Sequence, residues 1–129
     1  MAKKILIVDD SKTILKINTR IINAIYPDAE VVAFVTPGEA VESLKASKTV
    51  FDFALLDYNM EGMTGVELAQ ALVALSPAPV SYNKICVVSA NIQEAVISKA
   101  KGLGMEFEFK PFDEAKLKSF LSKKGISHD

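Results

Sequence analysis

Residues 51–62 read FDFALLDYNMEG, and this stretch decides the fold because it contains a buried strand that ends at an acid. The apolar run at residues 53–56 predicts a strand buried on both faces, as in a parallel sheet. The run stops at Asp57, and a polar turn and an amphipathic helix follow. Open α/β sheets place their chemistry at the carboxyl ends of strands, so Asp57 either carries function or merely solvates a strand end.

A predicted strand followed by a helix occurs five times along the chain, and the fifth strand alternates apolar residues with Glu106 and Glu108, as in a strand half open to water. Besides residues 53–56, strands are predicted at residues 5–8, 31–35, 85–88 and 105–109. Residues suited to capping precede the five predicted helices: Ser11, Thr36, Thr64, Asn91 and Asp113. The second helix is expected at about residues 37–46 and the fourth at residues 92–101. This alternation predicts an α/β fold with one five-stranded parallel sheet and helices on both faces.

Composition indicates one domain and excludes several classes of function. The 129 residues carry a formal net charge of −1, which leaves no electrostatic footprint for nucleic acid or an anionic membrane. The single cysteine, Cys86, excludes an internal disulfide, and the single histidine, His128, argues against a histidine-based metal site or a Ser/His/Asp triad. The first apolar run is too short for a signal peptide or a membrane span, so we expect a cytoplasmic protein without membrane insertion.

Polar side chains close four of the five predicted strands. Asp9 and Asp10 follow the first strand, Asp57 the third, Ser89 the fourth and Lys110 the fifth. In a parallel sheet all strand-to-helix loops lie at one edge, so these residues are expected to meet there if their strands are neighbours. The sequence therefore predicts one site built from distant segments.

Three carboxylates in one site require a counter-charge. At about 4 Å and an effective dielectric of about 20, each pair repels by roughly 4 kcal/mol, and one lysine offsets only part of this. A hard cation with oxygen ligands fits, and Mg²⁺ fits better than Ca²⁺ because the site offers few protein oxygens and Mg²⁺ keeps several waters. Zinc is disfavoured because no histidine or thiol is near.

Acids, a cation, a hydroxyl and an ammonium can together hold a phosphoryl group. The metal and Lys110 would neutralise its oxygens, and the hydroxyl of Ser89 would donate a hydrogen bond to a third. A carboxylate can attack phosphorus to form an aspartyl phosphate. We assign the nucleophile to Asp57 because it stands alone on the central strand, and the metal to the adjacent Asp9 and Asp10.

Four segments, IVDDS, LLDYNMEGMTG, VVSAN and FKPF, resemble the signature segments of the response-regulator receiver domain, in particular the single-domain CheY kind. The likeness covers essentially the whole chain, residues 1–129, in the family's order and spacing. Each motif alone is weak, but all four at strand ends of a chain with five strand-helix units are specific. The resemblance implies the flavodoxin-like strand order 2-1-3-4-5.

The resemblance also implies roles for the acids and for the residue two positions after Asp57. Asp57 would be the phosphoacceptor. Asp10 and Asp57 would ligate Mg²⁺ through their side chains, Asn59 through its backbone carbonyl and Asp9 through a water molecule. These assignments rest on the family likeness and not on spacing.

Three further residues match family positions. Lys110 would contact the phosphoryl group, and its peptide bond to the following proline is expected in the cis form. Ser89 would be the switch hydroxyl, at a position where threonine is commoner. Phe107 would be the aromatic switch, although motor-binding CheY proteins carry a tyrosine there. The resemblance implies a phosphodonor that is a histidine kinase or a histidine phosphotransfer protein. The output would be an unknown protein partner or onward phosphotransfer.

Two other classes of function stay open. An aspartyl-phosphate phosphohydrolase would need a second acid two residues after the nucleophile, where this chain has Asn59. A flavin or dinucleotide module would need glycines in the first strand-to-helix loop, where this chain has Asp-Asp-Ser. The favoured hypothesis is a signalling domain, not an enzyme, that assists its own phosphorylation and dephosphorylation.

Overall fold

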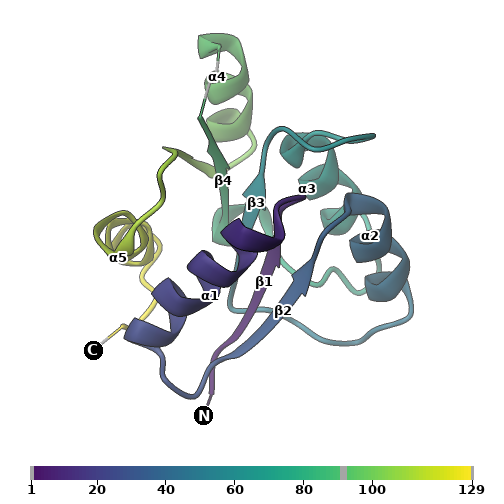
Figure 1. Cartoon of the computed structure of the whole chain (residues 1–129). Coiled ribbons are helices and arrows are strands. Elements are labelled where there is room, and N and C mark those ends of the chain that lie inside the picture. Colours follow the sequence, from purple (N-terminus) through teal and green to yellow (C-terminus); the bar gives the residue numbers. More distant parts are fainter. Residues whose placement is uncertain (1, 91–92, 129) are drawn as a thin grey trace.

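The computed structural model describes residues 2–90 and 93–128, and its centre is one parallel sheet. The strands are β1 (Lys4–Val8), β2 (Glu30–Phe34), β3 (Phe53–Asp57), β4 (Ile85–Ser89) and β5 (Glu106–Phe109). They lie in the order β2-β1-β3-β4-β5, and all neighbouring pairs run parallel. Figure 1 labels the first four of these strands. The predicted α/β class and the strand order are confirmed.

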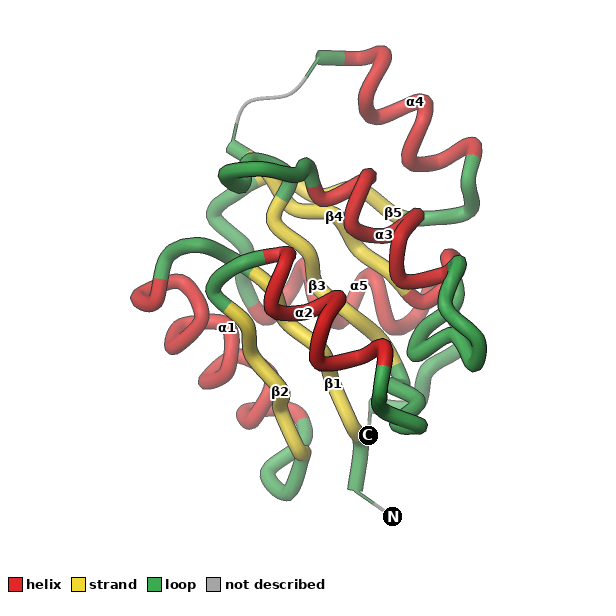
Figure 2. Tube along the Cα trace, turned by 90° about the vertical axis from the view of Figure 1, so that its right-hand side faces the viewer, coloured by secondary structure: helices red, strands yellow, loops and turns green. Residues whose placement is uncertain are grey.

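Within the described ranges, five helices cover the two faces of the sheet. They are α1 (Lys12–Ile25), α2 (Pro37–Lys45), α3 (Gly65–Val73), α4 (Glu94–Gly102) and α5 (Glu114–Lys123). Helices α1 and α5 pack on one face, and α2, α3 and α4 supply the core of the other (Figure 2). A short 3₁₀ turn, η1 (Tyr82–Lys84), leads into β4.

The side chains of β1 show why both faces need a cover. Successive residues of a strand point to opposite faces. Leu6 and Val8 join the core cluster that contains α2, α3 and α4, whereas Ile5 and Ile7 join the cluster that contains α1 and α5. Because burying one such side chain contributes about 1.5–3 kcal/mol, a strand that is apolar on both faces favours a three-layer fold.

Side-chain caps fix where four of the helices begin. Each predicted cap at these helices accepts the backbone N–H of the residue three positions later: Ser11, Thr36, Thr64 and Asp113. At α3 the capping box is complete, because Glu67 also accepts the N–H of Thr64. The described part of α4 begins at Glu94 after Gln93, which makes no side-chain cap. The predicted cap Asn91 and helix start at residue 92 lie outside the described residues.

Each of the five strands differs by one residue from its predicted range. Strand β1 also includes Lys4, β3 also includes Asp57 and β4 also includes Ser89. Strand β2 spans residues 30–34 instead of 31–35, because Glu30 pairs with Lys4 at the start of β1. Strand β5 begins at Glu106 because Met105 donates its N–H to Ala100 at the end of α4 rather than to a neighbouring strand. The predicted site residues still lie at the carboxyl ends of β1, β3, β4 and β5.

Candidate functional site

Four neighbouring strands bring the predicted polar residues to one edge of the sheet. Asp57 is the last residue of β3 and Ser89 the last of β4. Asp9 directly follows β1, and Lys110 directly follows β5. The backbone N–H of Lys110 donates to the carbonyl of Ser89 at 2.9 Å, which ties the ends of β4 and β5 together. The predicted convergence of these segments is therefore present in the structure.

The three acids form a compact cluster that could hold a metal ion. One carboxylate oxygen from each of Asp9, Asp10 and Asp57 lies within 4.8 Å of the others. Asp9 and Asp57 are only 4% and 5% exposed, whereas Asp10 faces solvent. A buried pair of carboxylates beside an exposed one offers hard oxygen ligands on one side and room for waters on the other, as Mg²⁺ requires.

Lys110 is the cation that the structure places against this cluster. Its Nζ lies 3.1 Å from Oδ1 of Asp57 and 3.3 Å from Oδ2 of Asp9. The lysine reaches both buried acids at once from the segment after β5. Three carboxylates against one ammonium leave two formal negative charges, so the arrangement still favours a divalent cation.

Burial and charge shift the protonation of this pair. Burial raises the pKa of Asp57, the charge of Asp9 raises it further, and the ammonium of Lys110 opposes both. Burial alone would lower the pKa of Lys110, but its hydrogen bond to Asp57 and the charge of Asp9 raise that pKa on balance. The lysine is therefore held in its charged form, next to a carboxylate whose ionisation is costly without a further cation.

Ser89 and Asn59 meet at the same edge. The side-chain amide of Asn59 donates a hydrogen bond of 3.1 Å to Oγ of Ser89. Ser89 is fully buried, and Asn59 lies on the exposed loop after β3. The resemblance assigned the backbone carbonyl of Asn59 to the metal but did not anticipate this side-chain contact.

Phe107 lies on β5, further along the sheet from the acids. It is partly buried and packs against the core cluster that contains α2, α3 and α4. Its ring meets that of the exposed Phe109 edge-on, with centroids 5.5 Å apart at 81°. Phe107 thus has one side in the core and one toward the surface.

The peptide bond between Lys110 and Pro111 is cis, as the resemblance implied.

Gly65 belongs to the site although sequence reasoning did not select it. It is the first residue of α3, and its N–H donates to the carbonyl of Tyr58 at 2.9 Å. A Cβ at this position would overlap the carbonyl oxygen of Asp57. The glycine therefore lets α3 begin directly against the backbone of the candidate nucleophile. The capping box beginning at Thr64 marked this helix start, but not the close approach.

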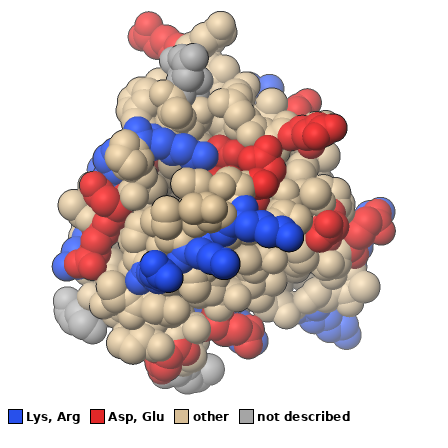
Figure 3. Space-filling model, viewed as in Figure 1, with Lys and Arg blue, Asp and Glu red and all other residues tan. Residues whose placement is uncertain are grey.

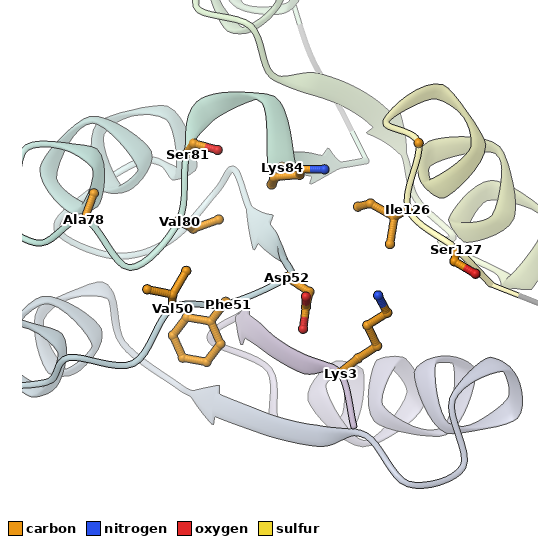
Figure 4. Close-up of a pocket in the computed structure, with 11 residues that line it drawn as sticks. Lys3, Val50, Phe51, Asp52, Ala78, Val80, Ser81, Lys84, Ile126 and Ser127 are labelled. Atoms are coloured by element: carbon orange, nitrogen blue, oxygen red, sulfur yellow. The ribbon is translucent and has the colours of Figure 1, made fainter. Parts of the chain in front are cut away.

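Of two cavities in the structure, one adjoins this cluster and the other lies away from it. One of about 360 Å³ adjoins Lys110, between α1 and the segment after β5, and is lined largely by apolar side chains such as Ile17 and Phe112. Another, of about 540 Å³, lies at the opposite, amino-terminal edge of the sheet, with Lys3 and Lys84 in its lining (Figure 4). The larger cavity is lined by none of the predicted site residues, so volume alone does not locate the chemistry.

Comparison with known proteins assigns the chain to a family. The model of the response regulator receiver domain matches residues 5–122, and the chain belongs to this family. The chemotaxis protein CheY of Pseudomonas aeruginosa is 32% identical over 125 residues, which cover 93% of this chain and 94% of that protein. The chain is thus a receiver domain of the CheY type, a domain of two-component signalling.

A longer relative agrees with this assignment, and two solved structures share the fold. Stress response regulator protein 1 of Meyerozyma guilliermondii is 33% identical over 116 residues, covering 85% of this chain but only 50% of that protein. The Vibrio cholerae chemotaxis protein CheY4, crystallized at low pH, has a TM-score of 0.76 at 24% identity, over 95% of this chain and 98% of its own. The bacteriophytochrome response regulator AtBRR has a TM-score of 0.79 at 18% identity, over 98% and 95%. At these identities the two structures establish the fold alone.

Among the helices formed by residues 2–90 and 93–128, none combines the length and apolar character needed to cross a bilayer.

Proposed function

We propose that this chain is the phosphoacceptor response regulator of a two-component system and is phosphorylated on Asp57. The observation that supports this most strongly is the position of Asp57, buried between two other acids and the ammonium of Lys110. The phosphodonor would be the phosphohistidine of a histidine kinase or of a histidine phosphotransfer protein. Output would pass through contact with a protein partner or through onward phosphotransfer.

The residues of the cluster fit a resident Mg²⁺. Asp10 and Asp57 would hold it through their carboxylates, Asn59 through its backbone carbonyl and Asp9 through a water molecule. When bound, Mg²⁺ would neutralise phosphoryl oxygens and part of the acid charge. The donor set supports this choice of metal, because it consists of carboxylate oxygens and because Asp10 is exposed to water.

The transfer itself would use the chain's own side chains. A carboxylate oxygen of Asp57 would attack phosphorus, the phosphorus–nitrogen bond of the donor would break, and its imidazole would take up a proton. Lys110, already 3.1 Å from Asp57, would donate to a phosphoryl oxygen as the new charge arrives. The hydroxyl of Ser89 would turn toward another oxygen, and Phe107 would follow as the aromatic switch.

We further propose that the chain works as a signalling switch and not as a turnover enzyme. A phosphohydrolase of this mechanism needs a general acid or base two residues after the nucleophile. Asn59 has that position, and its amide donates to Ser89 instead of titrating. The aspartyl phosphate would therefore persist long enough to bias the protein between two arrangements, typically by about 1–3 kcal/mol.

The surface beside the site supports a protein partner. Helix α1 contains no acidic residue, and its exposed side chains include Lys12, Lys16 and Arg20, spaced one helical turn apart. Basic side chains form a band over α1 in the space-filling view (Figure 3). Ile17, which is 42% exposed, lies on the same helix and lines the cavity next to Lys110. This surface would fit a phosphodonor with acidic and apolar side chains around its phosphohistidine.

Incubation with Mg²⁺ and acetyl phosphate tests the proposal directly. Intact-mass spectrometry should show the gain of one phosphoryl group in the wild-type chain and none in Asp57→Ala or in excess EDTA. Asp28→Ala, which removes an exposed acid from the turn before β2, should gain the group like wild type. No gain in the wild type, or a gain that survives in Asp57→Ala, would contradict the proposal.

A further inference from the structure

Lys116 holds the backbone on both sides of Lys110. Its Nζ donates to the carbonyl oxygen of Phe109 and to that of Pro111, each at 2.8 Å. These are the carbonyls immediately before and after Lys110 in the chain. Lys116 itself sits in the first turn of α5, where its N–H donates to the helix cap Asp113 at 2.8 Å. One ammonium thus joins the start of α5 to both ends of the Lys110 residue.

The segment that Lys116 contacts leaves the sheet at its edge strand. Strand β5 is the edge strand of the sheet, with β4 as its partner. Phe109, its last residue, is 48% exposed. The N–H of Lys110 is tied to Ser89 toward the sheet, whereas the two flanking carbonyls point to the ammonium of Lys116. Hydrogen bonds from a charged donor are stronger than neutral ones, so these two restrain the path of the chain from β5 to α5.

We propose that Lys116 is a positioning residue for Lys110 and so for phosphoryl transfer at Asp57; the second part rests on the proposed function. The side chain of Lys110 is long and flexible, and it must keep its ammonium within reach of both Asp57 and Asp9. Fixing its backbone on both sides narrows the positions that the ammonium can adopt. Lys116 acts on Asp57 through the backbone around Lys110 and not through a direct effect of its charge on that carboxylate. The charges that shift the pKa of Asp57 are those of Asp9, Lys110 and Asp10.

Helix α5 also offers a matched control. Lys118, two residues further along, is half exposed and pairs with Glu114 at 3.2 Å on the helix surface. Lys118→Met removes the same charge from the same helix without touching the carbonyls around Lys110. Lys116→Arg keeps the charge and several N–H donors, and should restore part of what Lys116→Met loses.

Amide hydrogen exchange of the full chain, followed by NMR without any phosphodonor, tests the structural half of the proposal. Loss of two such hydrogen bonds in Lys116→Met should speed exchange at the Lys110 N–H by about tenfold. Amides of β1 and β3 should exchange at the wild-type rate, since the two hydrogen bonds of the Lys116 ammonium go to Phe109 and Pro111 and not to those strands. Lys118→Met should match wild type throughout. Equal exchange at Lys110 in the two Met variants would overturn the proposal.

The functional half is measured with acetyl phosphate and, separately, with Mg²⁺ alone. In Lys116→Met the rate of phosphorylation should fall about five- to tenfold, whereas calorimetric Mg²⁺ affinity should stay within about twofold because the acids are untouched. If Lys116 only stabilised the fold, its loss would lower both the phosphorylation rate and the Mg²⁺ affinity, or neither of them. If Lys116→Met fails to fold, Lys116→Gln, which keeps N–H donors without the charge, is judged by the same two measurements, the phosphorylation rate and the Mg²⁺ affinity. If the wild type takes up no phosphoryl group, the proposed function fails, while the exchange result still decides the role of Lys116.

Discussion

The amide of Asn59 donates a 3.1 Å hydrogen bond to Oγ of Ser89, joining the loop after β3 to the end of β4. Under the proposed function, Ser89 has to reorient its hydroxyl toward a phosphoryl group on Asp57. The bond from Asn59 favours the arrangement that precedes phosphorylation. It therefore contributes to the free-energy difference between the two arrangements of the switch.

Removal of this donor should favour the activated arrangement. A neutral hydrogen bond contributes about 1 kcal/mol net, so Asn59→Ala should bind the phosphoryl mimic beryllofluoride about fivefold more tightly. Calorimetry in saturating Mg²⁺ measures this affinity. Asn83→Ala is the control, because Asn83 accepts a hydrogen bond from Ser81 at 2.6 Å before β4, at the other edge of the sheet. Weaker binding in Asn59→Ala than in the control would show that the bond does not oppose activation.

The raised pKa of Asp57 predicts that its charge destabilises the metal-free fold. Burial and the charge of Asp9 raise this pKa above its ordinary value of 3.8. An acid with a higher pKa when folded binds protons more tightly in the folded state. Its contribution to stability therefore falls as the pH rises from the unfolded pKa through the folded pKa. Above both values, the cost of the ionised carboxylate is fully present.

Asp57→Asn should consequently unfold at higher urea concentration than wild type at pH 7 in EDTA. The difference should shrink as the pH falls toward 3.8, because the wild-type carboxyl then becomes neutral as well. Circular dichroism during urea titration at several pH values measures it. Asp28→Asn, at an exposed turn position, should show no such gain at pH 7. A gain that grows on acidification would contradict the assignment of burial and Asp9 as the cause.

Mg²⁺ should stabilise the fold through the same cluster. A ligand that binds only the folded state at ten times its dissociation constant adds about 1.4 kcal/mol to the free energy of unfolding. Asp10→Asn removes one oxygen charge at the exposed side of the cluster and should lose most of this gain at the same Mg²⁺ concentration. Glu42→Gln, on the surface of α2, should keep it. If Mg²⁺ stabilised wild type, Asp10→Asn and Glu42→Gln equally at constant ionic strength, the ion would not bind at the cluster of acids.

The sheet and its functional edge could be predicted because they depend on features that are local in sequence. The apolar residues of each predicted strand favoured burial, and four of the five strands ended at a polar residue that marked the functional edge. Strand order in a parallel sheet was then enough to predict that Asp57, Ser89 and Lys110 lie together, without knowledge of the contacts between them. Their placement followed from the sequence, whereas their roles in phosphoryl transfer stay predictions.

The contacts that escaped prediction depend on the path of a loop or on one side-chain rotamer. Lys116 reads in the sequence as one of several lysines on a polar helix, and only the path of the chain after β5 places two carbonyls at its Nζ. The bond from Asn59 to Ser89 joins residues thirty positions apart. The extent of β5 also escaped, because Met105 reads as a strand residue but bonds to the end of α4. Sequence periodicity does not predict individual contacts of this kind.

The close approach of α3 to Asp57 leads to a last prediction. A methyl group on Gly65 would overlap the carbonyl oxygen and carbon of Asp57, and these are backbone atoms that cannot rotate away. Gly65→Ala should therefore shift either α3 or the end of β3. We expect a loss of about 1–3 kcal/mol of stability, as for overpacking in a core, together with slower phosphorylation of the displaced carboxylate.

Gly38→Ala provides the matched control for this prediction. Gly38 also lies in the first turn of a helix, α2, but a Cβ there would meet no atom within 4 Å. Alanine should be neutral at this position or stabilise by about 0.4–1 kcal/mol, because it restricts the unfolded chain. Urea unfolding and the acetyl phosphate reaction, run on both variants, separate the two sites. If Gly65→Ala matched Gly38→Ala in both measurements, the backbone of Asp57 would have room that the structure does not show, and Gly65 would have no part in the site.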